Sequence, residues 1–212
     1  MLGTIHKVGF WSGVIAFAST VAFVIVQSLQ LFSVIKFPLD EILIYGFSLC
    51  ITLPFLFEIL ALHYLTPVNS RFWSHAALIF TMMYVIFVTS NYVVQLATVI
   101  PMKLRGMTQE ISILDQTPHS LFWNFDAIGY IFMGFATLFA APLFSNHGLE
   151  GWVKISFLAH GFITPIIAFV YFYPGFSNML LLIGIPWAIT APVSMLLLAM
   201  SFRKDLQGKN KS

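Results

Sequence analysis

The segment FWNFDAIGY, residues 122–130, places one carboxylate, Asp126, inside an otherwise apolar stretch. If the segment is helical, Trp123 and Tyr130 share a face with Asp126, because they lie three residues before it and four residues after it. Removing a carboxylate from water is costly unless it is protonated, paired with a cation or hydrogen-bonded. Asp126 is therefore the first candidate for a group that binds a ligand.

Asn91 and Gln95 form a second polar feature, since residues four apart lie on one face of a helix. Taken alone, these amides indicate hydrogen bonds between helices, which contribute about 0.6–2 kcal/mol each in membranes. We expect one polar layer that joins them to the aspartate segment and consists of Asn91, Gln95, Trp123, Asp126 and Tyr130, with Gln27 within reach. Such a layer could hold the polar head of a bound molecule.

Glu58 and His160 are ionisable residues in two other apolar segments, both roughly 10–12 Å from the same membrane surface at 1.5 Å per helical residue. At equal depth they could share a proton, with the histidine as the group that switches near neutral pH. A histidine that only packs and bonds to a carbonyl or hydroxyl is the alternative. Pro54 and Pro165 each leave a backbone carbonyl without its usual donor, so both could mark unwound backbone beside a cavity.

The partner of Asp126 is an open question in the sequence. No lysine or arginine lies at its depth in any of the apolar segments. The carboxyl group could be protonated, or it could meet a histidine, a loop base such as Lys103 or Arg105, or a bound ligand that is cationic or hydroxylated.

These residues belong to a chain with the composition of a membrane protein. Of its 212 residues, 59% are hydrophobic and 8% are charged, with a mean hydropathy of +0.90. Soluble domains carry about 25% charged residues. Six segments reach the roughly 20 apolar residues that a spanning helix needs. We therefore predict an all-α integral membrane bundle of six transmembrane helices, a single domain over residues 1–212, with spans near 9–32, 41–65, 73–100, 119–144, 152–173 and 176–202.

The ends of these segments carry the residues expected there. Asp40 is placed to cap the second helix, and Thr117 or Ser120 to cap the fourth. Aromatic residues such as Tyr171 and Tyr173 near the helix ends are typical of the belts at membrane interfaces.

Lysine and arginine positions predict the orientation. With the N-terminus inside, the inner side holds seven basic residues and the outer side three, which favours both termini inside by the positive-inside rule. The inner group is Lys7, Arg71, Lys154, Arg203, Lys204, Lys209 and Lys211, and the outer group is Lys36, Lys103 and Arg105. The segment between the third and fourth helices is then an external loop, and we expect a multi-pass protein of a bacterial-type inner membrane.

Missing motifs exclude several kinds of site. The chain has no HExxH, GxSxG, Walker A or GxGxxG pattern and no Cys/His cluster that could hold zinc, so we predict neither a metal nor a cofactor. Cys50 is the only cysteine, so no disulfide can form within these residues. A net charge of +2 is too small to favour nucleic acid as a partner.

The function that these features favour is a membrane-embedded binder or carrier of a small apolar or lipid-like molecule, with proton coupling as a variant. Asp126, Asn91 and Gln95 would orient its polar head, and Glu58 and His160 would titrate or gate on the inner side. The alternatives are an intramembrane lipid-modifying enzyme, an isomerase or hydrolase that pairs a buried carboxylate with His160, and a non-catalytic scaffold subunit. The expected partners are membrane lipids and the small hydrophobic ligand, and the sequence sets no oligomeric state.

Overall fold

The computed structural model describes residues 2–209, without the side chains of residues 178 and 205–209. Helix makes up 82% of the chain, and no strand occurs in this described part. The long helices are α1 (Leu2–Leu31), α2 (Leu39–Leu65), α3 (Arg71–Val94), α5 (Leu121–Ala140), α6 (Gly148–Phe172) and α8 (Ile185–Lys209). Shorter segments extend or join them: η1 (Val68–Ser70), the π-helical η2 (Gln95–Val99), α4 (Ile100–Leu104), η3 (Ala141–Leu143) and α7 (Asn178–Leu182).

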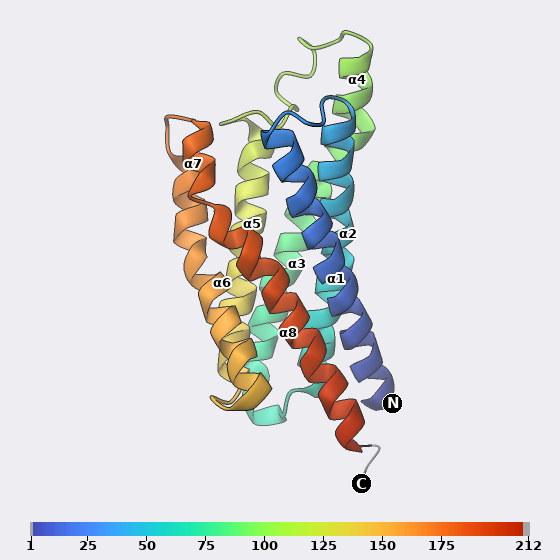
Figure 1. Ribbon diagram of the computed structural model, residues 1–212, viewed down its shortest axis with the longest axis vertical. Coiled ribbons are helices and arrows are strands. Elements are labelled where there is room, and N and C mark those ends of the chain that lie inside the picture. The colour runs from blue at the N-terminus through green and yellow to red at the C-terminus, as the bar shows by residue number, and fades with distance from the viewer. Residues whose placement is uncertain (1, 210–212) are drawn as a thin grey trace.

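The helices form one elongated bundle (Figure 1). α4, α7 and the loop after α4 lie at the upper end of the bundle as drawn, and both chain termini lie at the lower end. The most extensive contacts join α1 to α2 and α8, and α5 to α3 and α6. α8 crosses the bundle diagonally from the upper end of α6 towards the lower end of α1 (Figure 1). This crossing brings distant parts of the chain together around the upper half of the bundle.

Within residues 2–209, six helical segments are long and apolar enough to cross a membrane, in agreement with the six predicted spans. Their outer faces carry large exposed side chains such as Trp11 (60% exposed), Phe162 (69%) and Ile189 (61%). So much apolar surface is unusual in contact with water, whereas lipid tails accept it. The described chain therefore has the features of a multi-pass integral membrane protein.

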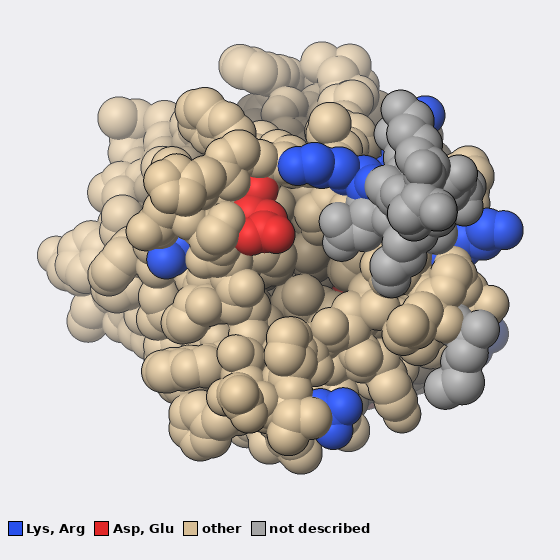
Figure 2. Space-filling view, turned by 90° about the horizontal axis from the view of Figure 1, so that it is seen from below, with Lys and Arg blue, Asp and Glu red and all other residues tan. Residues whose placement is uncertain are grey.

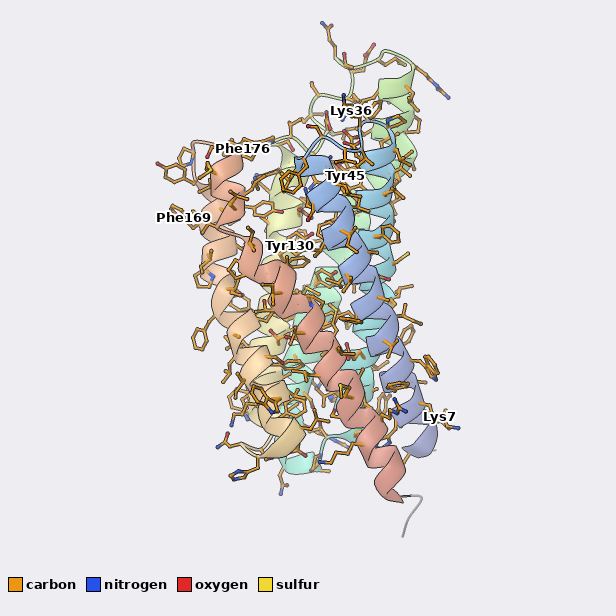
Figure 3. All side chains as sticks on the ribbon, in the orientation of Figure 1. Lys7, Lys36, Tyr45, Tyr130, Phe169 and Phe176 are labelled. Carbon is orange, nitrogen blue, oxygen red and sulfur yellow. The ribbon has the colours of Figure 1, made fainter. Side chains whose placement is uncertain are left out.

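The two predicted groups of basic residues lie at opposite ends of the bundle, as far as their side chains are described. Figure 3 places Lys7 near the lower end and Lys36 near the upper end, and Figure 2 shows basic side chains around the lower face. Of the inner group, Lys211 and the side chain of Lys209 lie outside the described residues. Which end faces the cytoplasm stays a prediction.

One of the predicted helix caps is confirmed and another is wrong. The side chain of Ser120 accepts a hydrogen bond from the backbone N–H of Trp123 (3.2 Å), so Ser120 caps α5. Asp40 does not cap α2, because the helix already begins at Leu39 and Asp40 lies inside its first turn. The Asp40 carboxylate instead accepts a hydrogen bond from the Gln30 side chain of α1 (2.9 Å).

Unwound backbone does not occur at the two prolines that suggested it. α2 and α6 continue through Pro54 and Pro165 without a break. The irregular backbone lies elsewhere: α3 changes to the π-helical η2 ahead of Pro101, and the last span is interrupted at Ile183–Gly184 between α7 and α8. Pro101 lacks the N–H that would bond four residues back, and a glycine followed two residues later by Pro186 is a frequent cause of a helix break.

Candidate functional site

A pocket of about 380 Å³ lies in the upper half of the bundle, among α1, α2, α5, α6 and the α7–α8 segment. We call it the upper pocket. Its polar and aromatic lining includes Gln27, Glu41, Tyr45, Tyr92, Trp123, Asp126, Tyr130, Tyr171 and Trp187, and its apolar lining includes Phe23, Val24, Ile44, Ile167, Val170, Leu182, Ile185 and Ala188. Figure 3 shows Tyr45 and Tyr130 at this level of the bundle. Cavities of this size commonly hold small ligands, for which about 300–1,000 Å³ is typical.

Asp126 lies in the wall of the upper pocket and is only 3% exposed. Tyr92 of α3 donates a hydrogen bond to its Oδ1 (2.5 Å), and Tyr171 of α6 donates one to its Oδ2 (2.7 Å). The hydroxyl groups of Tyr130 and Tyr92 are 3.0 Å apart. Because the single hydroxyl hydrogen of Tyr92 goes to Asp126, Tyr130 donates to Tyr92. One carboxyl group and three tyrosines thus form a network that joins three helices.

Trp123 holds the upper ends of α5 and α6 together beside this network. Its indole N–H donates to the backbone carbonyl of Tyr171 (3.0 Å), and the two rings lie with their centroids 4.6 Å apart. Phe23, Tyr130 and Trp187 also line the pocket, with ring centroids 5.8 Å apart for Phe23–Trp187 and 4.8 Å apart for Tyr130–Trp187. Contacts between aromatic rings of α1, α5 and α8 therefore form part of the pocket wall.

The predicted polar layer divides into two separate groups. Trp123, Asp126 and Tyr130 line the upper pocket, as does Gln27, but Asn91 and Gln95 are not among the residues that line it. The two amides bind the loop after α4 instead. Asn91 donates to the side chain of Gln116 (2.9 Å), and Gln95 donates to the backbone carbonyl of Leu114 (2.8 Å) and accepts from the backbone N–H of Gln116 (3.2 Å). They contribute indirectly, because Gln116 lines the pocket.

Lys103 does not reach Asp126. It forms ion pairs with Glu41 of α2 (3.0 Å) and with Asp115 of the loop (2.9 Å). The loop that contains Asp115 has no helix of its own and is fixed by these contacts and by the buried side chain of Ile111. Among the described residues no basic side chain pairs with Asp126. Neutral groups satisfy it within the protein: the hydroxyl groups of Tyr92 and Tyr171 and the side-chain amide of Gln116.

Glu58 is the second buried carboxyl group, and its surroundings differ. It is fully buried, and neither of its side-chain oxygens has a hydrogen-bond partner. A Cβ atom added at Gly13 of α1 would collide with Glu58 and would lie 2.8 Å from the Cβ of Ala199 in α8. The three helices α1, α2 and α8 therefore approach closely around this carboxyl group.

The structure does not join Glu58 to His160. The Nδ1 atom of His160 lies 3.1 Å from the hydroxyl of Thr190 in α8, and its ring is 2% exposed. Thr190 also donates to the carbonyl of Pro186 (3.0 Å). The equal depth that suggested a proton-sharing pair is thus not matched by contact, because the two side chains bond to or pack against different neighbours.

Sequence reasoning missed two members of the Asp126 network. Tyr171 was expected in an interfacial belt, but it lies seven residues after Thr164 and eleven after His160, which puts it on the same buried face of α6. Tyr92 lies eight residues after Tyr84 on the buried stripe of α3 and is 1% exposed. The helical period contained both signals, but aromatic residues were assigned to the polar layer only where they share the face of Asp126 on its own helix.

Comparison of the chain with models of known families, with curated proteins and with solved structures finds no match. The chemistry of the upper pocket must therefore be derived from its own residues.

Proposed function

We propose that the protein is a membrane-embedded binder of a small amphiphilic molecule, which it holds in the upper pocket. The observation that supports this function is the position of Asp126, a buried carboxyl group in the wall of a cavity of about 380 Å³, oriented by Tyr92 and Tyr171 without a basic partner. Three helices fix the carboxyl group before any ligand arrives. Such preorganisation lowers the entropy cost of binding.

The lining of the pocket suits the two parts of an amphiphile. Asp126, Tyr130 and Tyr171 contribute oxygen atoms to it. Aliphatic and aromatic side chains of α1, α6, α7 and α8 also line it: Phe23, Val24, Ile167, Val170, Leu181, Leu182, Ile185 and Trp187. Ligand pockets are commonly built in this way, with an apolar lining and a few polar groups that set orientation.

The alternatives have less support. An enzyme of the kind considered from the sequence needs a carboxyl group and His160 as an acid–base pair, but His160 bonds to Thr190 and does not line the upper pocket. A scaffold subunit would explain hydrogen bonds between helices, but it gives no reason for a cavity beside the carboxyl group. A binder accounts for both features.

Transport would require a second state. In the lower half of the bundle, α1, α2 and α8 are packed closely around Glu58, Gly13 and Ala199. Release towards the lower end would therefore need these helices to separate. The interruption at Ile183–Gly184, where α8 begins beside the pocket, is the place at which the last span could bend.

A matched pair of substitutions tests the binding function. Ala188 lines the pocket, whereas the next residue, Ile189, points outward and is 61% exposed. We expect Ala188→Phe to fill the cavity and Ile189→Phe to leave it open. Native mass spectrometry of the purified protein with octanol, octylamine and octanoate should detect saturable binding of at least one probe to the wild type and to Ile189→Phe, and none to Ala188→Phe.

The proposal is wrong if no probe binds saturably, or if the two variants bind equally. The melting temperatures of both variants without probe provide the control, since loss of folding would remove binding for another reason. Val24→Phe and Ile25→Phe repeat the comparison on α1, where Val24 lines the pocket and Ile25 is 55% exposed.

A further inference from the structure

The upper pocket presents carboxyl groups and no basic side chain. Asp126 and Glu41 are among its lining residues, and none of the lining residues is a lysine, arginine or histidine. Glu41 is paired with Lys103, but the partners of Asp126 among the described residues are neutral: the hydroxyl groups of Tyr92 and Tyr171 and the side-chain amide of Gln116. A ligand that completes the charge balance of this pocket carries a positive charge.

The hydrogen atoms of the tyrosine network are already used. Tyr92 and Tyr171 each donate their single hydroxyl hydrogen to Asp126, and Tyr130 donates to Tyr92. The free positions on Asp126, Tyr130 and Tyr171 are therefore lone pairs, which can only accept hydrogen bonds. The polar part of the ligand must supply hydrogen atoms, as an ammonium group does.

Aromatic rings surround the same space. Tyr45 and Tyr92 lie with ring centroids 5.4 Å apart, and Tyr130 contacts both Tyr171 and Trp187 within 6.2 Å between centroids. The faces of tyrosine and tryptophan rings attract cations, and an anion gains no such contact from them.

The charges around the two ends of the bundle agree with this assignment. The upper end carries four acidic residues, Asp40, Glu41, Glu110 and Asp115, beside three basic ones, Lys36, Lys103 and Arg105. At the lower end, Glu150 is the only acidic residue whose side chain the structure describes, and Figure 2 shows several basic side chains on this face. The electrostatic potential at the upper end of the bundle therefore favours a cation over an anion.

We propose that the ligand of the upper pocket is a protonated amine, whose ammonium group donates hydrogen bonds to Asp126 and Tyr130 and whose apolar part lies against α1 and α8. This inference rests on the proposed binding function and names the class of ligand. A free amphiphilic amine suits the pocket better than an aminophospholipid, because the lipid phosphate would meet no basic residue in its lining.

The test compares probes with the same eight-carbon chain and different heads. Octylamine, octyltrimethylammonium, octanol and octanoate are titrated against wild-type protein in phosphatidylcholine nanodiscs, and binding is followed by the quenching of tryptophan fluorescence and by native mass spectrometry. We expect octylamine to bind most tightly. Octyltrimethylammonium should bind more weakly because it donates no N–H, and octanoate should not bind.

Asp126→Asn separates charge from shape, since the amide keeps the size of the carboxyl group. It should weaken octylamine binding by about tenfold or more, which is the scale of one hydrogen bond to a charged group, and change octanol binding little. The inference is wrong if octanol or octanoate binds as tightly as octylamine, or if Asp126→Asn leaves octylamine affinity unchanged.

Two further results separate the amine inference from the binding function, and a free amine from a lipid headgroup. If octanol or octanoate binds best and Ala188→Phe blocks it, the amine inference fails while the binding function stands. If adding phosphatidylethanolamine to the nanodiscs displaces octylamine in the wild type but has no effect in Asp126→Asn, the ammonium recognition is confirmed and its source is the lipid head. We expect no such displacement.

Discussion

Two buried carboxyl groups in one bundle have opposite surroundings. Asp126 in the upper half accepts hydrogen bonds from two tyrosines and lies beside a cavity of about 380 Å³. Glu58 in the lower half has no hydrogen-bond partner and is enclosed by helices close enough that a Cβ at Gly13 would collide with it. Burial of an acid in a membrane helix therefore does not by itself indicate a binding site. A binding site also needs a cavity beside the acid and neighbouring groups that orient it.

The largest expected effect is a loss of stability when the hydrogen-bonded carboxyl group of Asp126 is removed. Asp126→Leu removes the acceptor of Tyr92 and Tyr171, so two buried hydroxyl groups lose the hydrogen bond that they donate. Each such loss costs about 1–3 kcal/mol, so the free energy of unfolding should fall by roughly 2–6 kcal/mol. Thermal unfolding followed by circular dichroism in detergent measures the change. Asp126→Asn, which still offers one acceptor oxygen, should lose much less, and equal losses would contradict the network.

A smaller loss is expected where the lower half is packed most closely. Gly13→Ala places a methyl group against Glu58 and within 2.8 Å of the Cβ of Ala199, which should cost about 1–3 kcal/mol through overpacking. Gly46→Ala is the matched control, because nothing lies within 4 Å of a Cβ at that helical position. The control should be neutral or stabilising by about 0.5–1 kcal/mol, since alanine favours helix over glycine. A stable Gly13→Ala variant would mean that α1, α2 and α8 are not in close contact there.

The smallest expected effect has the opposite sign. Glu58→Met replaces a partnerless carboxyl group by an apolar side chain of similar length, so it should raise the free energy of unfolding by about 1 kcal/mol. The same thermal measurement, with octylamine binding as a second readout, checks it. Binding should stay within about twofold of the wild type, as expected for a residue that does not line the pocket. Loss of binding would show that the two halves are coupled.

The six helices and their order could be predicted from the sequence because membrane helices need long apolar runs, and those runs are separated by polar turns and loops. Asp126, Trp123 and Tyr130 were identified as one face because their spacing alone determines it. The upper pocket could not be predicted, since it depends on the diagonal path of α8 and on the break at Gly184. Periodicity within one helix does not report how that helix crosses another.

The roles of individual polar residues were hardest to predict. Asn91 and Gln95 were assigned to the ligand, but they bind the loop after α4, whose irregular path leaves no periodic signal. Lys103 was considered as a partner of Asp126, but it forms ion pairs with Glu41 and Asp115 instead. Equal depth suggested that Glu58 meets His160, although depth along the membrane says nothing about which helices are neighbours. These choices depend on rotation and packing, which only the folded bundle specifies.

The most direct measurement is an experimental structure of the protein in nanodiscs saturated with octylamine. We predict density in the upper pocket, with the amine nitrogen about 3 Å from a carboxylate oxygen of Asp126 and the alkyl chain against Phe23 and Ile185. No density should appear next to Glu58. An empty upper pocket at saturating octylamine, or an alkyl chain at Asp126 with the nitrogen pointing away, would contradict the account.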